Sequence, residues 1–244
     1  MTTQTATKPT MNVEIWSDVM CPFCYIGKRK FEQALAQFPQ RDQVQVIWKS
    51  FQLNPNQKTE PNRSLNDYLA DAKGWSLEQT RAMNERVTDM ASEVGLTYHL
   101  DRAVVANSFD AHRLIQLAKT QGLGDAMEER LFLAYFTEGL NTADHATLLR
   151  LGTEVGLSAE SVEQVLGSNQ FADAVRQDIY ESQQVGVRGV PFFVLNGRYA
   201  VSGAQAPDTF LGALTTAWTN WKQTQPALTD LSADAPACDI DGNC

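Results

Sequence analysis

Cys21-Pro22-Phe23-Cys24 is the stretch on which the predicted fold and chemistry depend. An apolar run typical of a strand, residues 11–17, precedes it, and a stretch with helical periodicity, residues 22–38, follows it. Two cysteines one helical turn apart have Cα atoms about 5–6 Å apart, which is within reach of a disulfide. Unpaired amides and the positive dipole end at a helix start favour a thiolate. Pro22 fits there because the first helical residue needs no N–H donor. The stretch therefore predicts a redox-active dithiol.

The amino-acid composition argues against a nucleic-acid-binding or a membrane-spanning protein. The chain has 244 residues, of which 43% are hydrophobic and 20% charged, as in an ordinary soluble globular protein with a sizeable core. The net charge is −9 and no block of Lys and Arg occurs, so nucleic acid is excluded as the main partner. No apolar run approaches the roughly 18 residues that a membrane helix needs.

The two ends of the chain bear on the redox compartment. Residues 1–10 are polar and lack an apolar segment, so we expect a flexible tail and no secretory signal. A cytoplasmic location follows, where a disulfide is transient and catalytic rather than structural. The other two cysteines, Cys238 and Cys244, lie in a Pro-, Ala- and Asp-rich stretch, residues 224–244, that we interpret as a second tail.

The pattern along the chain predicts an α/β fold with an inserted all-helical domain. Strand, helix and strand are expected at 11–17, 22–38 and 44–53, followed by a proline-containing linker. Helices are then expected at 64–72, 76–94, 107–121, 123–137, 142–154, 158–168 and 171–185. Strands at 190–195 and 199–201 flank the hairpin turn Asn196-Gly197, and the last helix is expected at 207–222.

Without the helical block the order is β-α-β-α-β-β-α, the order of a thioredoxin fold: a mixed sheet flanked by helices. We therefore expect a thioredoxin domain in two parts, residues 11–58 and 171–223. The inserted helical domain would span 59–170, and the tails would span 1–10 and 224–244.

Three separate stretches carry a resemblance to a known family: residues 17–27, 107–114 and 186–194. Together they resemble the DsbA-like thioredoxin-fold oxidoreductases, specifically the cytoplasmic FrnE-like branch, over residues 11–222. The resemblance implies a thiol–disulfide oxidoreductase or isomerase with no cofactor beyond its redox-active disulfide. It implies protein or peptide thiols and disulfides and small-molecule thiols as partners. Glutathione or the thioredoxin system would be the electron partner.

The resemblance also implies roles for residues. Cys21 would be the exposed nucleophilic thiolate and Cys24 the buried resolving thiol. The Val190–Pro191 bond would be cis and would bare the backbone of Val190 for pairing with an incoming peptide; the alternative is an ordinary trans proline that opens an edge strand. The residues expected to contact substrate are Pro22, Phe23, Val190 and His112. For His112, core packing or a hydrogen bond is the simpler interpretation, and an acid–base role is the alternative.

The sequence departs from the family pattern in two places, and one of them is the Cys238/Cys244 pair, which lies outside the common core of the fold. Many thioredoxins have a buried carboxylate six residues before the first motif cysteine, where this chain has Ile15. Glu14 and Asp18 are nearby, but the sequence does not show that either reaches Cys24, so the proton acceptor is left open between a carboxylate and water. The basic run Lys28-Arg29-Lys30 would raise the positive potential near the motif or, more simply, form a solvated helix face.

Three functions are compatible with these residues. In the first, Cys21 attacks a substrate disulfide and Cys24 resolves the mixed disulfide. Cys238 and Cys244 would then be a second redox pair that exchanges with the motif, or a passive pair of thiols. In the second, all four cysteines bind zinc. The third is a glutathione-dependent isomerase or transferase, against which the intact CxxC argues because those relatives usually have Ser at the position of Cys21.

Overall fold

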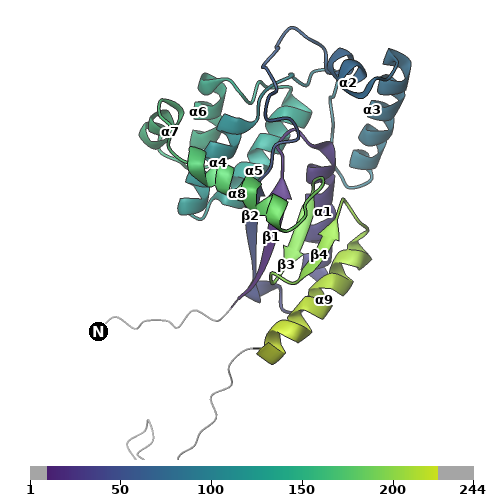
Figure 1. The fold of residues 1–244 in the computed structure, drawn as a ribbon, viewed down its shortest axis with the longest axis vertical. Coiled ribbons are helices and arrows are strands. Elements are labelled where there is room, and N and C mark those ends of the chain that lie inside the picture. Colours follow the sequence, from purple (N-terminus) through teal and green to yellow (C-terminus); the bar gives the residue numbers. More distant parts are fainter. Residues whose placement is uncertain (1–9, 225–244) are drawn as a thin grey trace, which may run out of the picture.

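The computed structural model describes residues 10–224 and contains a four-stranded mixed sheet flanked by helices (Figure 1). The strands lie in the order β2-β1-β3-β4, where β1 is Met11–Ser17, β2 is Val44–Ser50, β3 is Phe192–Leu195 and β4 is Tyr199–Ser202. Strand β1 runs parallel to β2 and antiparallel to β3, and β3 runs antiparallel to β4. This is the predicted thioredoxin fold.

An all-helical insertion separates β2 from β3, as predicted. The helices are α1 (Pro22–Gln37), α2 (Leu65–Lys73), α3 (Leu77–Ser92), α4 (Phe109–Thr120), α5 (Gly124–Leu133), α6 (His145–Glu154), α7 (Ala159–Leu166), α8 (Ala172–Gln184) and α9 (Pro207–Thr224). A short 3-10 turn, η1 (Arg41–Gln43), precedes β2, and a π-helical segment, η2 (Ala134–Glu138), follows α5. None of the helices in residues 10–224 combines the length and the apolar character that crossing a membrane requires.

One face of the sheet packs against α1 and α9. Val13 and Ile15 of β1 are fully buried in the main core cluster together with aromatic side chains of both helices. The rings of Phe31 in α1 and Phe210 in α9 lie 5.5 and 4.6 Å, centroid to centroid, from the ring of Phe193 in β3. The last residue of β1, Ser17, has the same parity as Val13 and Ile15 and therefore points toward the α1 side.

The opposite face packs against α8. The indole of Trp16 donates a hydrogen bond to the backbone carbonyl of Asp178 at 2.8 Å. The carboxylate of Asp178 accepts the amide of Ser50 at 2.9 Å and the side-chain amide of Gln116 at 2.5 Å. Helix α8 is thereby connected to the ends of β1 and β2 and to α4 by buried polar contacts.

Local capping signals in the sequence are confirmed. Ser64 accepts the amide of Asp67 at the start of α2, and Ser76 and Gln79 form a reciprocal capping box at the start of α3. Asn196 and Gly197 both have positive φ, 52° and 63°, in the turn between β3 and β4, as the predicted hairpin requires.

The helix predicted over 142–154 begins at His145, because Asp144 is its N-cap. Two other predicted limits are wrong because of a contact with a distant segment. Strand β2 ends at Ser50 rather than Leu53, since the amide of Leu53 donates to the Asp18 carboxylate at 2.8 Å instead of to a strand. The helix predicted over 123–137 changes to π geometry at Ala134. There the carbonyl of Phe136 accepts the amide of His99 at 2.6 Å.

Candidate active site

The two motif cysteines lie on one turn at the start of α1. Cys21 is the N-cap residue, in an extended conformation, and Pro22 takes the first helical position. The amide of Cys24 donates to the carbonyl of Cys21 at 3.0 Å, and the amide of Cys21 donates to the carbonyl of Asp18 at 2.9 Å. The turn brings both side chains into the same buried cluster, where their sulfurs interact.

Both thiols are buried, and they are not bonded to each other in this structure. Cys24 is 1% exposed, as expected for a resolving thiol, but Cys21 is only 4% exposed, so the expectation of an exposed nucleophile is wrong. The half-buried side chains of Met20, Phe23 and Val190 pack against the cluster that contains both cysteines. An incoming sulfur has to displace part of this cover to reach Cys21.

Pro191 lies beside the cysteines. The Val190–Pro191 peptide bond is cis, as the resemblance implies, and the sulfur of Cys21 donates to the carbonyl of Val190 at 3.4 Å. The carbonyl of Pro191 accepts the amide of Gly203 at 2.8 Å, which connects the segment to the end of β4. A Cβ at Gly27 would lie 2.8 Å from Cγ of Pro191. Helix α1 and the proline segment therefore approach this closely because residue 27 has no side chain.

The environment of Cys24 holds its proton. Burial raises the pKa of Cys24 well above the usual value for a thiol, and the hydrogen bond and charge of Cys21 raise it further. The Asp18 backbone and the Ser17 hydroxyl act in the opposite direction without compensating. Because the thiolate is the nucleophile, Cys24 reacts only after this proton has been removed.

His112 of α4 is buried close to the motif loop. Its Nε2 lies 3.6 Å from Oδ1 of Asp18, and neither ring nitrogen has a hydrogen-bond partner among residues 10–224. Burial lowers the pKa of His112, but the carboxylates of Asp18 and Glu128 outweigh burial, so the net shift is upward. The two carboxylates thus favour the protonated form of the ring. A contact of His112 with substrate stays a prediction.

A family model confirms what this geometry indicates. The model of the DSBA-like thioredoxin domain matches residues 12–215. The chain belongs to the DsbA-like thioredoxin domain family. Among solved structures, a probable DsbA oxidoreductase from Streptomyces coelicolor is 39% identical to this chain, with a TM-score of 0.81. The similarity covers 96% of this chain and 98% of that one.

Two other similar proteins have a lower sequence identity to this chain. The uncharacterized protein YwbO of Bacillus subtilis is 28% identical over 207 residues, which is 84% of this chain and 96% of YwbO. The cytosolic disulfide reductase DsbM from Pseudomonas aeruginosa, in a structure with GSH, is 19% identical to this chain, with a TM-score of 0.57. The similarity covers 87% of this chain and 98% of the DsbM chain. At that identity the likeness to DsbM concerns the fold alone.

In this DsbA-like protein the prediction that the basic run of α1 forms a solvated helix face is wrong. Lys28 is 3% exposed and forms ion pairs with Glu32, with Asp125 at 3.4 Å and with Glu129 at 3.1 Å. Arg29 binds Glu129 as well. These pairs connect α1 to α5 and hold the insertion against the helix that carries the cysteines.

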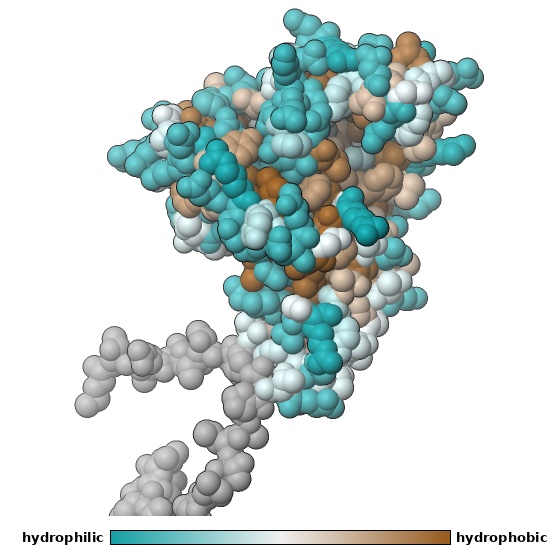
Figure 2. Space-filling model, viewed as in Figure 1, coloured by the Kyte–Doolittle hydropathy of each residue, from teal (hydrophilic) through white to brown (hydrophobic). Residues whose placement is uncertain are grey.

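A partly apolar cavity of about 310 Å³ begins at the residue before the motif. Its lining includes Met20, Leu53, Tyr68, Val105 and Tyr135. Leu53 is 53% exposed. In the space-filling view, apolar side chains gather near the middle of the face where the helical insertion meets the sheet, whereas the outer parts of the insertion are mainly hydrophilic (Figure 2). The family's motif thus lies next to apolar surface.

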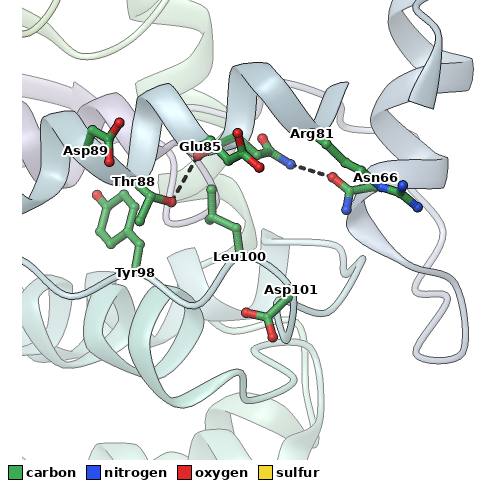
Figure 3. A pocket seen from close by; sticks show the side chains of 9 residues that line it. Asn66, Arg81, Glu85, Thr88, Asp89, Tyr98, Leu100 and Asp101 are labelled. Carbon is green, nitrogen blue, oxygen red and sulfur yellow. Dashed lines mark hydrogen bonds between the residues drawn. The ribbon is translucent and has the colours of Figure 1, made fainter. Parts of the chain in front are cut away.

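A second pocket of about 330 Å³, lined mainly by polar residues, lies between α3 and residues 98–101 (Figure 3). Glu85 and Asp89 of α3 line one side, and Tyr98 and Asp101 line the other. The hydroxyl of Tyr98 donates to the carbonyl of Pro22 at 2.8 Å. The pocket wall is therefore in direct contact with the first turn of α1.

Two predicted site residues, Cys238 and Cys244, lie outside the described residues. The proposed second redox pair and the four-cysteine zinc site both stay predictions. Within residues 10–224, no three side chains of His, Cys, Asp or Glu are grouped so that they could hold a metal ion.

Proposed function

We propose that the protein is a thiol–disulfide oxidoreductase in which Cys21 attacks and Cys24 resolves. The observation that supports this best is the sharing of one buried helical turn by two free thiols, with the backbone carbonyl of Val190 3.4 Å from the sulfur of Cys21. The family membership supports thiol chemistry as well.

The reaction follows from the two thiols. The Cys21 thiolate attacks one sulfur of a substrate disulfide, the substrate S–S bond breaks, and the other substrate sulfur leaves as a thiolate. Cys24 then loses its proton and attacks the sulfur of Cys21. The Cys21–Cys24 bond forms, the second substrate sulfur leaves, and the two electrons of the dithiol have passed to the substrate. The reverse sequence oxidises a substrate dithiol, and release without resolution isomerises a disulfide.

We propose protein and peptide disulfides or thiols as substrates, together with small-molecule thiols. Half-buried Phe23, Pro22 and Val190 surround Cys21, and the cavity that starts at Met20 is wide enough for a side chain next to the substrate cysteine. A chain that lies along this surface places its cysteine over the motif. A cytoplasmic location, and regeneration by glutathione or the thioredoxin system, complete the proposal.

Insulin reduction tests this function with two variants. Cys21→Ser should abolish turnover, because the attacking sulfur is lost. Cys24→Ser should retain the attack and accumulate a mixed disulfide between Cys21 and the insulin chain, visible by mass spectrometry of the intact adduct. Full activity of Cys21→Ser would refute the mechanism. Glutathione-dependent turnover that survives in Cys24→Ser would favour the isomerase or transferase alternative.

The same preparations test the role of the tail cysteines. If Cys238 and Cys244 exchange with the motif, the double variant Cys238→Ser/Cys244→Ser should still react once with substrate but should be reoxidised or re-reduced more slowly. Unchanged turnover would indicate a passive pair. One tightly bound zinc per chain, with thiols that titrate only after chelation, would favour the zinc alternative.

A further inference from the structure

A buried carboxylate from the insertion reaches the end of β1. The hydroxyl of Ser17 donates a hydrogen bond to Oε1 of Glu128, on α5, at 2.6 Å, and each of the two residues is 1% exposed. Ser17 is the last residue of β1 and faces the same side of the sheet as α1. A glutamate buried this deeply is rare and costs free energy, so its position calls for an explanation.

Cys24 is the reacting group that this arrangement serves. The Cys24 thiol is 1% exposed, so bulk water has no direct access to its proton. The hydroxyl of Ser17 acts on the Cys24 sulfur by hydrogen bonding and lowers its pKa, against the larger effect of burial. A hydroxyl oxygen has acceptor lone pairs beside its one proton, so with that proton donated to Glu128 the oxygen of Ser17 can still accept a hydrogen bond from the thiol.

We propose that Glu128 accepts the proton of Cys24 through the hydroxyl of Ser17 when Cys24 attacks the mixed disulfide at Cys21. The inference rests on the proposed function and adds the missing base to it. The thiol proton passes to the Ser17 oxygen while the Ser17 proton passes to the Glu128 carboxylate. The Cys24 thiolate forms the bond to Cys21, and the substrate sulfur leaves as a thiolate that takes a proton from solvent. Glu128 ends the step protonated.

The charged groups around Glu128 suit a base that works near neutrality. Burial raises its pKa, the charges of His112 on α4 and Lys28 on α1 and the bond from Ser17 lower it, and Asp125 raises it, with a result of about 7. The charge of Lys119 on α4 also interacts with the charge of the Glu128 carboxylate. A base whose pKa lies close to the operating pH transfers protons most effectively.

The carboxylates closer in sequence are engaged elsewhere. Asp18 accepts the amides of Met20 at 3.3 Å and Leu53 at 2.8 Å, which fixes the motif loop. Glu14 lies 3.6 Å from Lys49, the residue whose ammonium also binds Asp178 of α8 on the other face of the sheet. Glu128 is the carboxylate that bonds to Ser17.

The test separates the two chemical steps with Ellman's disulfide. The reduced protein should release one equivalent of the coloured thiol when Cys21 attacks and a second when Cys24 resolves. In Glu128→Gln, the first release should keep its rate within about twofold, and the second should slow at least about tenfold. The wild-type rate of the second release should also rise through a step near the Glu128 pKa of about 7, and this step should be lost in the variant.

Glu129→Gln is the matched control, because Glu129 is the next residue of α5 but binds Arg29 and Tyr25 instead of Ser17. It should keep the step in the pH profile of the second release. Ser17→Ala should behave like Glu128→Gln, and Ser17→Thr, which keeps the hydroxyl, should restore the step. If Glu128→Gln does not fold, the Ser17 pair decides the question.

The results of the Ellman assay distinguish failure of the proton relay from failure of the proposed function. A second release with the wild-type rate and pH profile in Glu128→Gln, or in Ser17→Ala when the former is unfolded, overturns the relay. Loss of the step in Ser17→Thr as well would overturn it too, since the hydroxyl would then be irrelevant. Absence of the first release in the wild-type protein would refute the proposed function itself, which is a different result.

Discussion

At the scale of single residues, Gly27 controls how closely α1 approaches the proline segment. A methyl group there would lie 2.8 Å from the ring of Pro191, a contact that neither rigid partner can relieve without moving. We expect Gly27→Ala to destabilise the fold by about 2 kcal/mol, as overpacking does. Because the carbonyl of Val190 would move relative to Cys21, insulin reduction should fall by about tenfold or more. Chemical denaturation and the insulin assay measure the two effects.

Gly212 provides the control for this substitution. It lies inside α9, where an added Cβ would meet no atom of the described part of the chain within 4 Å. Gly212→Ala should therefore raise the free energy of unfolding by about 0.5 kcal/mol through helix propensity and leave insulin reduction unchanged. If Gly27→Ala behaved in the same way, the close approach would have no role in placing Pro191.

Tyr98 is the residue that connects the insertion to the first turn of α1. Its hydroxyl donates to the Pro22 carbonyl, and its ring lies 4.6 Å from that of Phe136. Tyr98→Phe keeps the ring and removes the donor, so the free energy of unfolding should fall by about 1 kcal/mol in urea denaturation. Tyr180→Phe, at a side chain 55% exposed, should stay within about 0.5 kcal/mol of wild type. Equal effects would mean that the Tyr98 bond does not stabilise the turn.

At the scale of elements, the sequence predicted what neighbouring residues decide. Ser64 and Ser76 cap their helices through residues three positions away, and the turn at Asn196-Gly197 needs only its own backbone conformation. The ends of β2 and α5 depend on distant partners instead. The π-helical segment η2 offers a carbonyl to the amide of His99, a partner that no periodicity in α5 reveals.

The burial of the basic run illustrates the same limit. Lys28 follows the motif by four residues and has the charge of a surface residue, and local rules place it in solvent. It is buried because Asp125 and Glu129 approach from α5. An ion pair across two elements has no signal in either element alone, since the register between α1 and α5 is set by the whole fold.

At the scale of the molecule, the candidate site is assembled from both parts of the chain. The cysteines could be predicted because spacing and helix position are local, and Pro191 because three distant stretches together resemble a family. Glu128 was missed: it belongs to the insertion, follows no motif, and meets Ser17 only when α5 packs beside α1. Sequence reasoning left the proton acceptor of Cys24 open because Ile15 occupies the position of the usual carboxylate, and Glu128 is the residue that we propose for that role.

The pH dependence of global stability should carry the signature of Glu128. Its pKa is about 7 in the folded protein against 4.5 for an ordinary Glu, so the folded state binds the proton more tightly. The contribution of Glu128 to the free energy of unfolding is fully present below pH 4.5. It falls by about 3 kcal/mol as pH rises to about 7. Glu128→Gln has no such proton. The free energy of unfolding of Glu128→Gln minus that of wild type, measured in urea, should therefore increase by about 3 kcal/mol from acid to slightly alkaline pH.

Glu129 should show the opposite dependence, although it is the adjacent residue of the same helix. Burial raises its pKa, but the hydrogen bonds from Arg29 and Tyr25 and the charges of Lys28 and Arg29 lower it by more. Its contribution is present above the usual carboxyl pKa and is lost as pH falls through the lower folded value. Glu129→Gln should thus be less stable than wild type at neutral pH, with a difference that shrinks in acid. Two neighbouring variants with opposite slopes cannot result from a general loosening of α5. Parallel curves for both would show that burial does not raise the pKa of Glu128.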